Sequence, residues 1–133
     1  MRRKPKELII MEWAKSASSR SSCSRLQVGS ILMDKDMRRV LAWGYNGGVS
    51  GESNHCESDE PGNCGCIHSE INCLISSEGT KEKDMIMFVT DSPCLHCAKC
   101  IINAGVTVLY YSREYRIKDG LNLLERKILV HKI

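Results

Sequence analysis

The sequence lacks the features of a membrane or secreted protein. Within its 133 residues no apolar run approaches the roughly 20 residues that a membrane-spanning helix needs. The basic N-terminal stretch leads into the short apolar run 8–11, which ends at Glu12, so no signal-peptide core follows it. Internal repeats and low-complexity tracts are also absent. We therefore expect a cytoplasmic protein without a membrane partner.

A strong excess of charge of one sign is missing as well. Lys and Arg number 19, Asp and Glu number 16, and four of the positive charges lie in residues 2–6. The rest of the chain is close to neutral, which argues against a nucleic-acid partner bound over a broad basic face. A small anionic substrate remains compatible, because one or two Arg side chains suffice to hold a phosphate. The length and a hydrophobic content of 42% predict a single domain over residues 1–133.

Hydrophobic patterning predicts alternating helices and strands. Helices are expected at 6–20, 68–77 (ending near Gly79), 93–104 and 121–127, and strands at 28–33, 40–45, 85–90, 106–111 and 128–131. The first two strands are typical of a hairpin, while the later alternation of helix and strand predicts parallel crossovers. The expected fold class is therefore α/β, with helices on both faces of one mixed sheet.

Eight cysteines would suggest a disulfide framework if a chain of this length were secreted. They lie at 23, 56, 64, 66, 73, 94, 97 and 100. Without a signal peptide, the same number favours metal ligands or free thiols. The spacing supports metal, since a C-x-C and two overlapping C-x-x-C pairs suit thiolates that surround one zinc ion.

Two motifs at the starts of predicted helices carry the chemistry: H-S-E at 68–70 and P-C-L-H-C at 93–97. Free N–H groups at a helix start lower the cost of a thiolate, and Cys94 and Cys97 share one helix face. With His68 they make three ligands, which leaves a position where zinc can hold and acidify water. Glu70 lies too far round the helix from His68 to bind the same metal, but it can face the open position and transfer protons.

Each motif has a less specific interpretation by itself. A lone C-x-x-C could be a redox pair or half of a zinc knuckle, and H-x-E is common by chance. Cys97 and Cys100 form a second C-x-x-C pair, but Pro93 favours Cys94 in the first helical turn and leaves Cys100, like Cys73, as a small buried residue. Together and in this order, the motifs are the signature of zinc nucleobase deaminases.

The sequence resembles the deoxycytidylate (dCMP) deaminase family, within the cytidine deaminase superfamily, over most of its length. The similarity rests on motifs in the family's order at 22–25, 28–29, 44–47, 55–56, 68–70 and 92–97. Ser69 stands where the family usually has Ala, and Asn72 is retained. The resemblance implies a three-layer α-β-α fold with a five-stranded mixed sheet.

The same resemblance implies zinc-dependent hydrolysis of dCMP to dUMP and ammonia, which would supply dUMP for dTMP synthesis. His68, Cys94 and Cys97 would bind the catalytic zinc. Glu70 would be the proton shuttle, relaying a proton to N3 of cytosine and then to the departing ammonia.

Three further residues are expected to contact the substrate. By the resemblance, Asn46 would contact the sugar or base, and Arg25 and Tyr115 would lie near the phosphate. From the residues alone, Asn46 could equally be a turn residue, Arg25 a surface charge and Tyr115 a packing residue.

Some members of the family carry a second, structural metal. Its tentative ligands here are Cys23, His55, Cys64 and Cys66, most of which lie in or beside the long polar loop 49–63. A metal would explain how such a loop stays ordered, whereas the alternative is a set of free thiols. Because His55 and Cys56 are adjacent, we do not expect both to reach one ion.

Some members also form hexamers that dCTP activates and dTTP inhibits. The stretch 47–50 resembles the glycine-rich loop used there. A homo-oligomer, with these nucleotides as effectors, is therefore a further expectation.

Two other classes of function remain open from the sequence. The first is a deaminase of cytidine, CMP or adenosine in tRNA; a nucleoside enzyme would not depend on Arg25, and a tRNA enzyme would favour a more basic surface. The second is a zinc-stabilised binding module without catalysis. Such a module would have no use for Glu70 beside an open coordination position.

Overall fold

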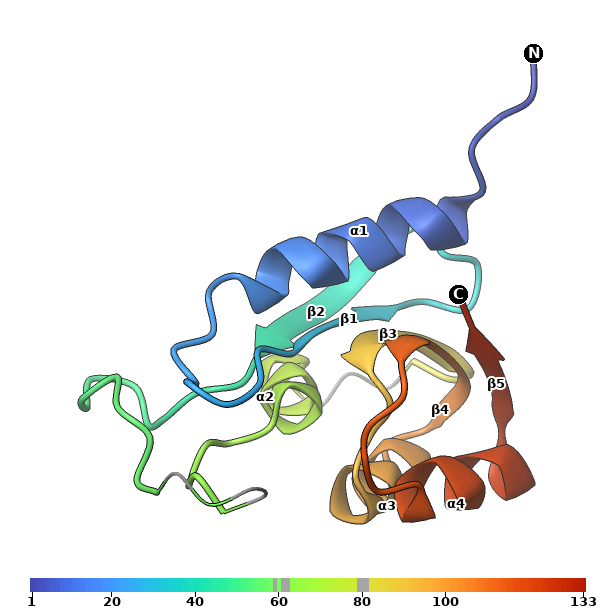
Figure 1. The fold of residues 1–133 in the computed structure, drawn as a ribbon. Helices are drawn as coiled ribbons and strands as arrows, with labels where there is room; N and C mark the ends of the chain where they lie inside the picture. Colours follow the sequence, from blue (N-terminus) through green and yellow to red (C-terminus); the bar gives the residue numbers. More distant parts are fainter. Residues whose placement is uncertain (59, 61–62, 79–81) are drawn as a thin grey trace.

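Four helices and five strands make up the fold in the computed structural model, which describes all residues except 59, 61–62 and 79–81 (Figure 1). The helices are α1 (Lys6–Ser18), α2 (Ser69–Ser76), α3 (Leu95–Asn103) and α4 (Asp119–Lys127). The strands are β1 (Gly29–Met33), β2 (Val40–Tyr45), β3 (Met85–Asp91), β4 (Val106–Arg113) and β5 (Leu129–Lys132). They form one sheet in the order β2-β1-β3-β4-β5.

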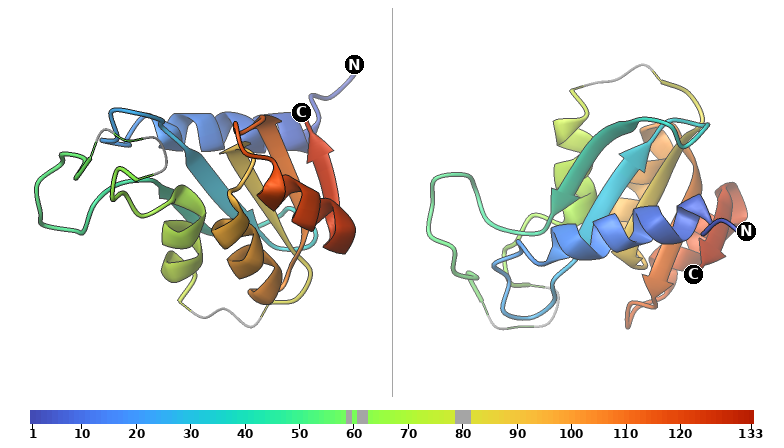
Figure 2. Two further views of the ribbon diagram at one scale, coloured as in Figure 1. Left: turned by 60° about the horizontal axis from the view of Figure 1, so that its bottom comes forward. Right: turned by 90° about the horizontal axis from the view of Figure 1, so that it is seen from above.

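The sheet is mixed and has a helical layer on each face. β1 is antiparallel to both β2 and β3, whereas β3 with β4 and β4 with β5 are parallel. Helix α1 covers one face, and α2, α3 and α4 cover the other (Figures 1 and 2). Side chains of the buried strand β3 pack against both helical layers. Met87 and Val89 pack on the side of α3, while Ile86 and Phe88 pack on the side of α1. This alternation is the two-residue period of a strand buried on both faces.

One end of the sheet gathers segments that are far apart in the sequence. The parallel strands β3 and β4 end there, with Asp91 paired to Arg113, and the antiparallel strand β1 begins there. Helices α2 and α3 also begin at this end. In open α/β sheets, ligands bind outside the carboxyl ends of parallel strands, so this end is the candidate location for a site.

The predicted fold class is confirmed, with local differences at the helix ends. Cys94 is the N-cap of α3, so Pro93 precedes the helix instead of occupying its first turn as predicted. Helix α4 begins at Asp119, two residues earlier than expected. Helix α2 ends at Ser76, and the stop predicted near Gly79 lies outside the described residues. None of the helices in the described part of the chain is both long and apolar enough to cross a bilayer.

Helix α2 packs directly on the backbone of β2. A Cβ atom on Gly44 would lie 2.7 Å from both the Cys73 nitrogen and the Ser69 oxygen, so no other residue fits there without moving the helix. The fully buried Ser69 adds polar contacts: its Oγ donates to the Gly44 oxygen at 3.1 Å and lies 2.7 Å from Ser30 Oγ. Together these contacts fix the first turn of α2 against the sheet.

We expect Gly44→Ala to lower the free energy of unfolding by about 1–3 kcal/mol, the usual cost of overpacking a close contact. Chemical denaturation would measure the change. Gly48→Ala is the matched control, because a Cβ there meets only the Ser53 oxygen at an ordinary 3.6 Å. Equal stability of the two variants would contradict the close packing of α2.

Candidate active site

The N-termini of α2 and α3 bring one histidine and two cysteines together. His68 is the N-cap of α2, Cys94 is the N-cap of α3, and Cys97 lies one turn further along α3. His68 Nδ1 is 3.4 Å from Cys94 Sγ and 3.3 Å from Cys97 Sγ. All three ligand atoms lie within 4.8 Å of one another. The three side chains predicted as ligands of one metal are therefore neighbours in the structure.

This donor set fits zinc. Thiolates and imidazole are the usual zinc ligands in proteins. Among the residues that the structure describes, no fourth His, Cys, Asp or Glu joins this group. Three protein ligands are the composition of a site that keeps one position open for water, whereas a structural site closes with four.

Hydrogen bonds at the start of α3 favour a thiolate at Cys94. Its sulfur accepts the backbone N–H of Cys97 at 3.5 Å. Side-chain hydrogen bonds with Cys97 and His68 lower the pKa of the Cys94 thiol to about 4, against the opposing effect of burial. The same hydrogen bonds raise the pKa of Cys97 and of His68. The cluster therefore gives up its first proton at Cys94, where the helix dipole also favours negative charge.

Glu70 is a buried carboxylic acid beside this cluster. It lies in the first turn of α2, its residue is 4% exposed, and it lines the adjoining cavity. Burial raises the pKa of the Glu70 carboxyl to about 7, and the negative charge of Cys94 acts in the same direction. A carboxyl group that exchanges its proton near neutral pH is suited to general acid–base chemistry.

A cavity of about 320 Å³ opens next to His68, Cys94 and Glu70. This volume lies at the lower end of the range for small-molecule sites. The three residues predicted to contact a substrate, Arg25, Asn46 and Tyr115, all line it. The structure thus brings the predicted catalytic and binding residues to one space.

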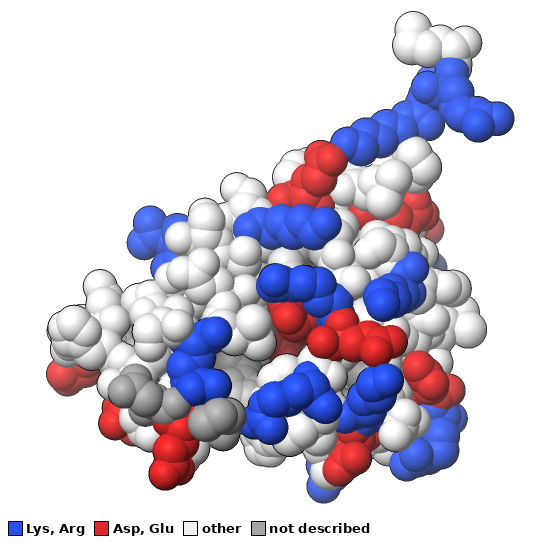
Figure 3. All heavy atoms as spheres, viewed as in Figure 1, with Lys and Arg blue, Asp and Glu red and all other residues white. Residues whose placement is uncertain are grey.

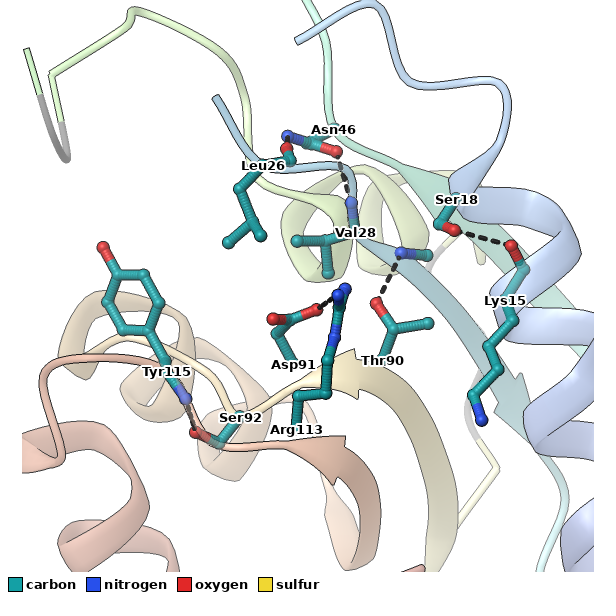
Figure 4. A network of polar contacts seen from close by, with 11 residues as sticks. Lys15, Ser18, Leu26, Val28, Asn46, Thr90, Asp91, Ser92, Arg113 and Tyr115 are labelled. Carbon is teal, nitrogen blue, oxygen red and sulfur yellow. Dashed lines mark hydrogen bonds and ion pairs between the residues drawn. The ribbon is translucent and has the colours of Figure 1, made fainter. Parts of the chain in front are cut away.

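Asn46 holds one wall of the cavity in place (Figure 4). Its Oδ1 accepts the Val28 N–H at 2.9 Å, and its Nδ2 donates to the Leu26 oxygen at 2.7 Å. On the opposite wall, the Tyr115 N–H donates to Ser92 Oγ at 2.8 Å, and Figure 4 shows the Tyr115 ring and the Leu26 side chain pointing toward the same space. The two hydrogen bonds of the Asn46 side chain give this residue a structural role in the cavity wall.

Sequence reasoning missed three charged residues of the cavity: Asp91, Glu114 and Arg116. Asp91 is buried and accepts from Arg113 Nη2 at 2.8 Å (Figure 4). All three follow or end the predicted strands β3 and β4. The sequence signal that could have identified them is their position at the carboxyl ends of two strands predicted to be parallel, where ligands bind in open α/β sheets.

Four other cysteines form a second cluster, which we call the four-cysteine cluster. Its members are Cys23, Cys56, Cys64 and Cys66, whose sulfur atoms all lie within 4.8 Å of one another. The structure differs from the expected set in one member, because Cys56 takes the place of His55, which is exposed. All eight cysteines of the chain are free thiols.

The sulfur separations in the four-cysteine cluster match a tetrahedral zinc site. Cys56 Sγ lies 3.6 Å from Cys23 Sγ and 3.8 Å from Cys66 Sγ, and Cys23 Sγ lies 3.8 Å from Cys64 Sγ. Zinc–sulfur bonds of about 2.3 Å at tetrahedral angles give sulfur–sulfur edges of about 3.8 Å. Hydrogen bonds from the Ser24 backbone N–H and hydroxyl lower the pKa of the Cys56 thiol to about 7, while burial raises the pKa of Cys66. With four ligands, this site would be closed to substrate.

The sequence matches known proteins along most of its length. Residues 5–113 match the family model described as the cytidine and deoxycytidylate deaminase zinc-binding region. ComE operon protein 2 from Bacillus subtilis is 38% identical over 110 residues, which cover 73% of this chain and 53% of that protein. The deoxycytidylate deaminase of Saccharomyces cerevisiae is 29% identical over 121 residues, covering 83% of this chain and 38% of that protein. The chain thus spans about half or less of these two relatives.

A solved structure matches the whole fold. It is the crystal structure of dCMP deaminase from the cyanophage S-TIM5 in complex with dCMP and dUMP, with a TM-score of 0.86 and 35% sequence identity. The match covers 99% of this chain and 100% of that chain. The likeness therefore extends from α1 to the final strand and includes the end of the sheet that carries both clusters.

We expect Cys97→Ser to lower the bound zinc by about one ion per chain, because a serine hydroxyl is a poor substitute for a thiolate ligand. Elemental analysis of protein purified with zinc would measure the stoichiometry. Cys100→Ser is the control, since Cys100 belongs to neither cluster. Unchanged zinc in Cys97→Ser would show that α3 supplies no metal ligand at this position.

Proposed function

Because the chain belongs to the cytidine and deoxycytidylate deaminase family, we propose that it hydrolyses dCMP to dUMP and ammonia. The observation that carries this proposal is the buried Glu70 beside an open three-ligand cluster, on the wall of a small cavity. The choice of dCMP is supported by the S-TIM5 dCMP deaminase in complex with dCMP and dUMP, which this chain resembles over its full length.

In this proposal His68, Cys94 and Cys97 hold zinc. Zinc, when bound, supplies Lewis-acid activation of the water that replaces the amino group. Cys94 is predisposed to this role because its thiol is already acidic at the start of α3. The packing of α2 on Gly44 keeps His68 opposite the two thiolates.

Glu70 is proposed to move the protons. It accepts a proton from the attacking water and delivers it to N3 of the cytosine ring. It then accepts the proton of the hydroxyl newly attached to C4 and passes it to the amino group, which leaves C4 as ammonia. Each transfer needs a carboxyl group that is close to the reacting atoms and able to release its proton near neutral pH. Burial of Glu70, with the resulting rise of its pKa, supports this assignment.

Recognition of the nucleotide is assigned to the outer wall of the cavity. Arg25 and Tyr115 are proposed to contact the phosphate, and Arg116 adds a third candidate whose guanidinium lies 5.4 Å from the centre of the Tyr115 ring. Asn46 is proposed to contact the sugar or base in addition to holding the wall. A small nucleotide is favoured over tRNA, because acidic and basic side chains are interspersed over the face drawn in Figure 3.

The four-cysteine cluster is proposed to hold a second zinc ion. Sulfur separations of 3.6–3.8 Å support a tetrahedral site, and four thiolates leave no position for a substrate. Its role would thus be structural. The residues assigned to it are Cys23, Cys56, Cys64 and Cys66.

Assembly and regulation stay predictions. A hexamer controlled by dCTP and dTTP is what the resemblance implies for this chain. The glycine-rich stretch Gly47–Ser50 is exposed apart from Gly47, which pairs with Ile67 beside the cavity wall. Trp13 and Trp43 are large exposed apolar side chains that a subunit contact could cover.

The function is tested by ammonia release from the zinc-loaded protein with dCMP, CMP, deoxycytidine and cytidine. We expect kcat/KM for dCMP to exceed that for deoxycytidine by about 10-fold or more, since a charged hydrogen bond to phosphate contributes that much. Equal rates would refute the phosphate site. No turnover of any of the four compounds would refute the deaminase proposal.

We expect Glu70→Gln to retain zinc and the folded structure but to lower kcat by roughly 10²- to 10⁴-fold, because the amide cannot transfer protons. Glu125→Gln, an exposed change on α4, is the control. Deamination by Glu70→Gln at the parent rate would remove Glu70 from the mechanism.

A further inference from the structure

Arg25 lies on a short segment that is fixed at both ends. At one end, Cys23 belongs to the four-cysteine cluster and is buried. At the other end, the Leu26 oxygen and the Val28 N–H are both bonded to the side chain of Asn46. The position of Arg25 in the cavity wall is thus set by two anchors.

The anchor at Cys23 depends on Cys56. Between Cys23 and Arg25, the Ser24 backbone N–H and Oγ both donate to Cys56 Sγ, at 3.5 and 3.6 Å. Cys56 Sγ is itself 3.6 Å from Cys23 Sγ. Hydrogen bonds to sulfur are weak, so the contacts that Ser24 makes with Cys56 hold this end of the segment less firmly than a metal bridging Cys23 and Cys56 would.

The four-cysteine cluster also forms part of the cavity itself. Cys23, Cys64 and Cys66 line the cavity together with Arg25, whereas Cys56 does not line it. The Cys64 oxygen accepts the Glu57 N–H at 2.7 Å, which ties the two ends of the intervening loop. A metal ion that joins the four sulfur atoms would therefore clamp two cavity-wall segments to each other.

We propose that metal bound by the four-cysteine cluster positions Arg25, and so determines the preference of the cavity for a nucleotide over the corresponding nucleoside. This inference rests on the proposed function, in which Arg25 contacts the phosphate. The cluster acts on the phosphate end of the ligand, while His68, Cys94 and Cys97 act on the base. Loss of the second zinc thus weakens recognition of the phosphate without dismantling the three-ligand cluster.

The test is calorimetric binding of dUMP and deoxyuridine to the full chain, with zinc counted in each sample. In Cys56→Ser, which leaves the residues lining the cavity unchanged, we expect one zinc fewer and a dUMP-to-deoxyuridine preference about 10-fold lower, the contribution of one charged hydrogen bond. Arg25→Ala should lose the same preference while keeping both zinc ions. The double variant should lose no more than either single variant, because both changes remove one interaction.

Cys100→Ser is the control and should keep both the zinc content and the preference of the parent. If Cys56→Ser does not fold, Cys56→His supplies a weaker fourth ligand, and its preference should rise as added zinc fills the cluster. An unchanged preference after loss of the second zinc, or a parent with no preference for dUMP, would overturn the proposal. Failure of the parent to deaminate dCMP would instead refute the proposed function and leave this binding comparison intact.

Discussion

The site depends on the close contact between helix α2 and the backbone of β2. At Gly44 there is no room for a side chain, and Ser69 is bonded across the same interface to β1 and β2. This interface determines where the first turn of α2 begins, and the first turn carries both His68 and Glu70. A comparable contact supports α3, since a Cβ on Gly120 of α4 would lie 2.2 Å from the Pro93 oxygen. The reactive residues are thus held by packed backbone and not by flexible loops.

The eight cysteines divide according to the geometry of their surroundings. Two of them lie at a helix start beside a histidine and leave a coordination position open, while four close on one another. The remaining two, Cys73 and Cys100, lie within helices α2 and α3. Cys73 is fully buried and packs as a small apolar residue. One residue type therefore occurs in three kinds of surroundings, and three protein ligands are typical of a catalytic zinc site whereas four are typical of a structural one.

Much of this arrangement could be predicted from the sequence because it follows from local periodicity. The strand and helix patterns yielded the α/β fold class, and the spacing of H-x-E and P-C-x-x-C indicated which helix starts must meet. Sequence could not choose between His55 and Cys56, because the path of an irregular loop decides which of two neighbours faces inward. It also missed Asp91 and Arg116, although the predicted parallel strands end beside them, because the folded path of the chain after each strand decides which side chains line the cavity. Pro93 suggested a helix start two residues too early, because the Cys94 backbone is still extended and α3 begins at Leu95.

The cavity is assembled from five stretches of chain that lie far apart in the sequence, near residues 25, 46, 66, 92 and 115. No single stretch forms a binding surface by itself, so recognition exists only in the folded chain. Any ligand that binds there will favour the folded state by mass action, and more strongly as its concentration rises. The converse also holds: local opening of any one of the five stretches removes contacts from the site and so lowers its affinity for a ligand. In such a molecule, the occupancy of the site and the free energy of unfolding are thermodynamically linked, so a change in either one changes the other.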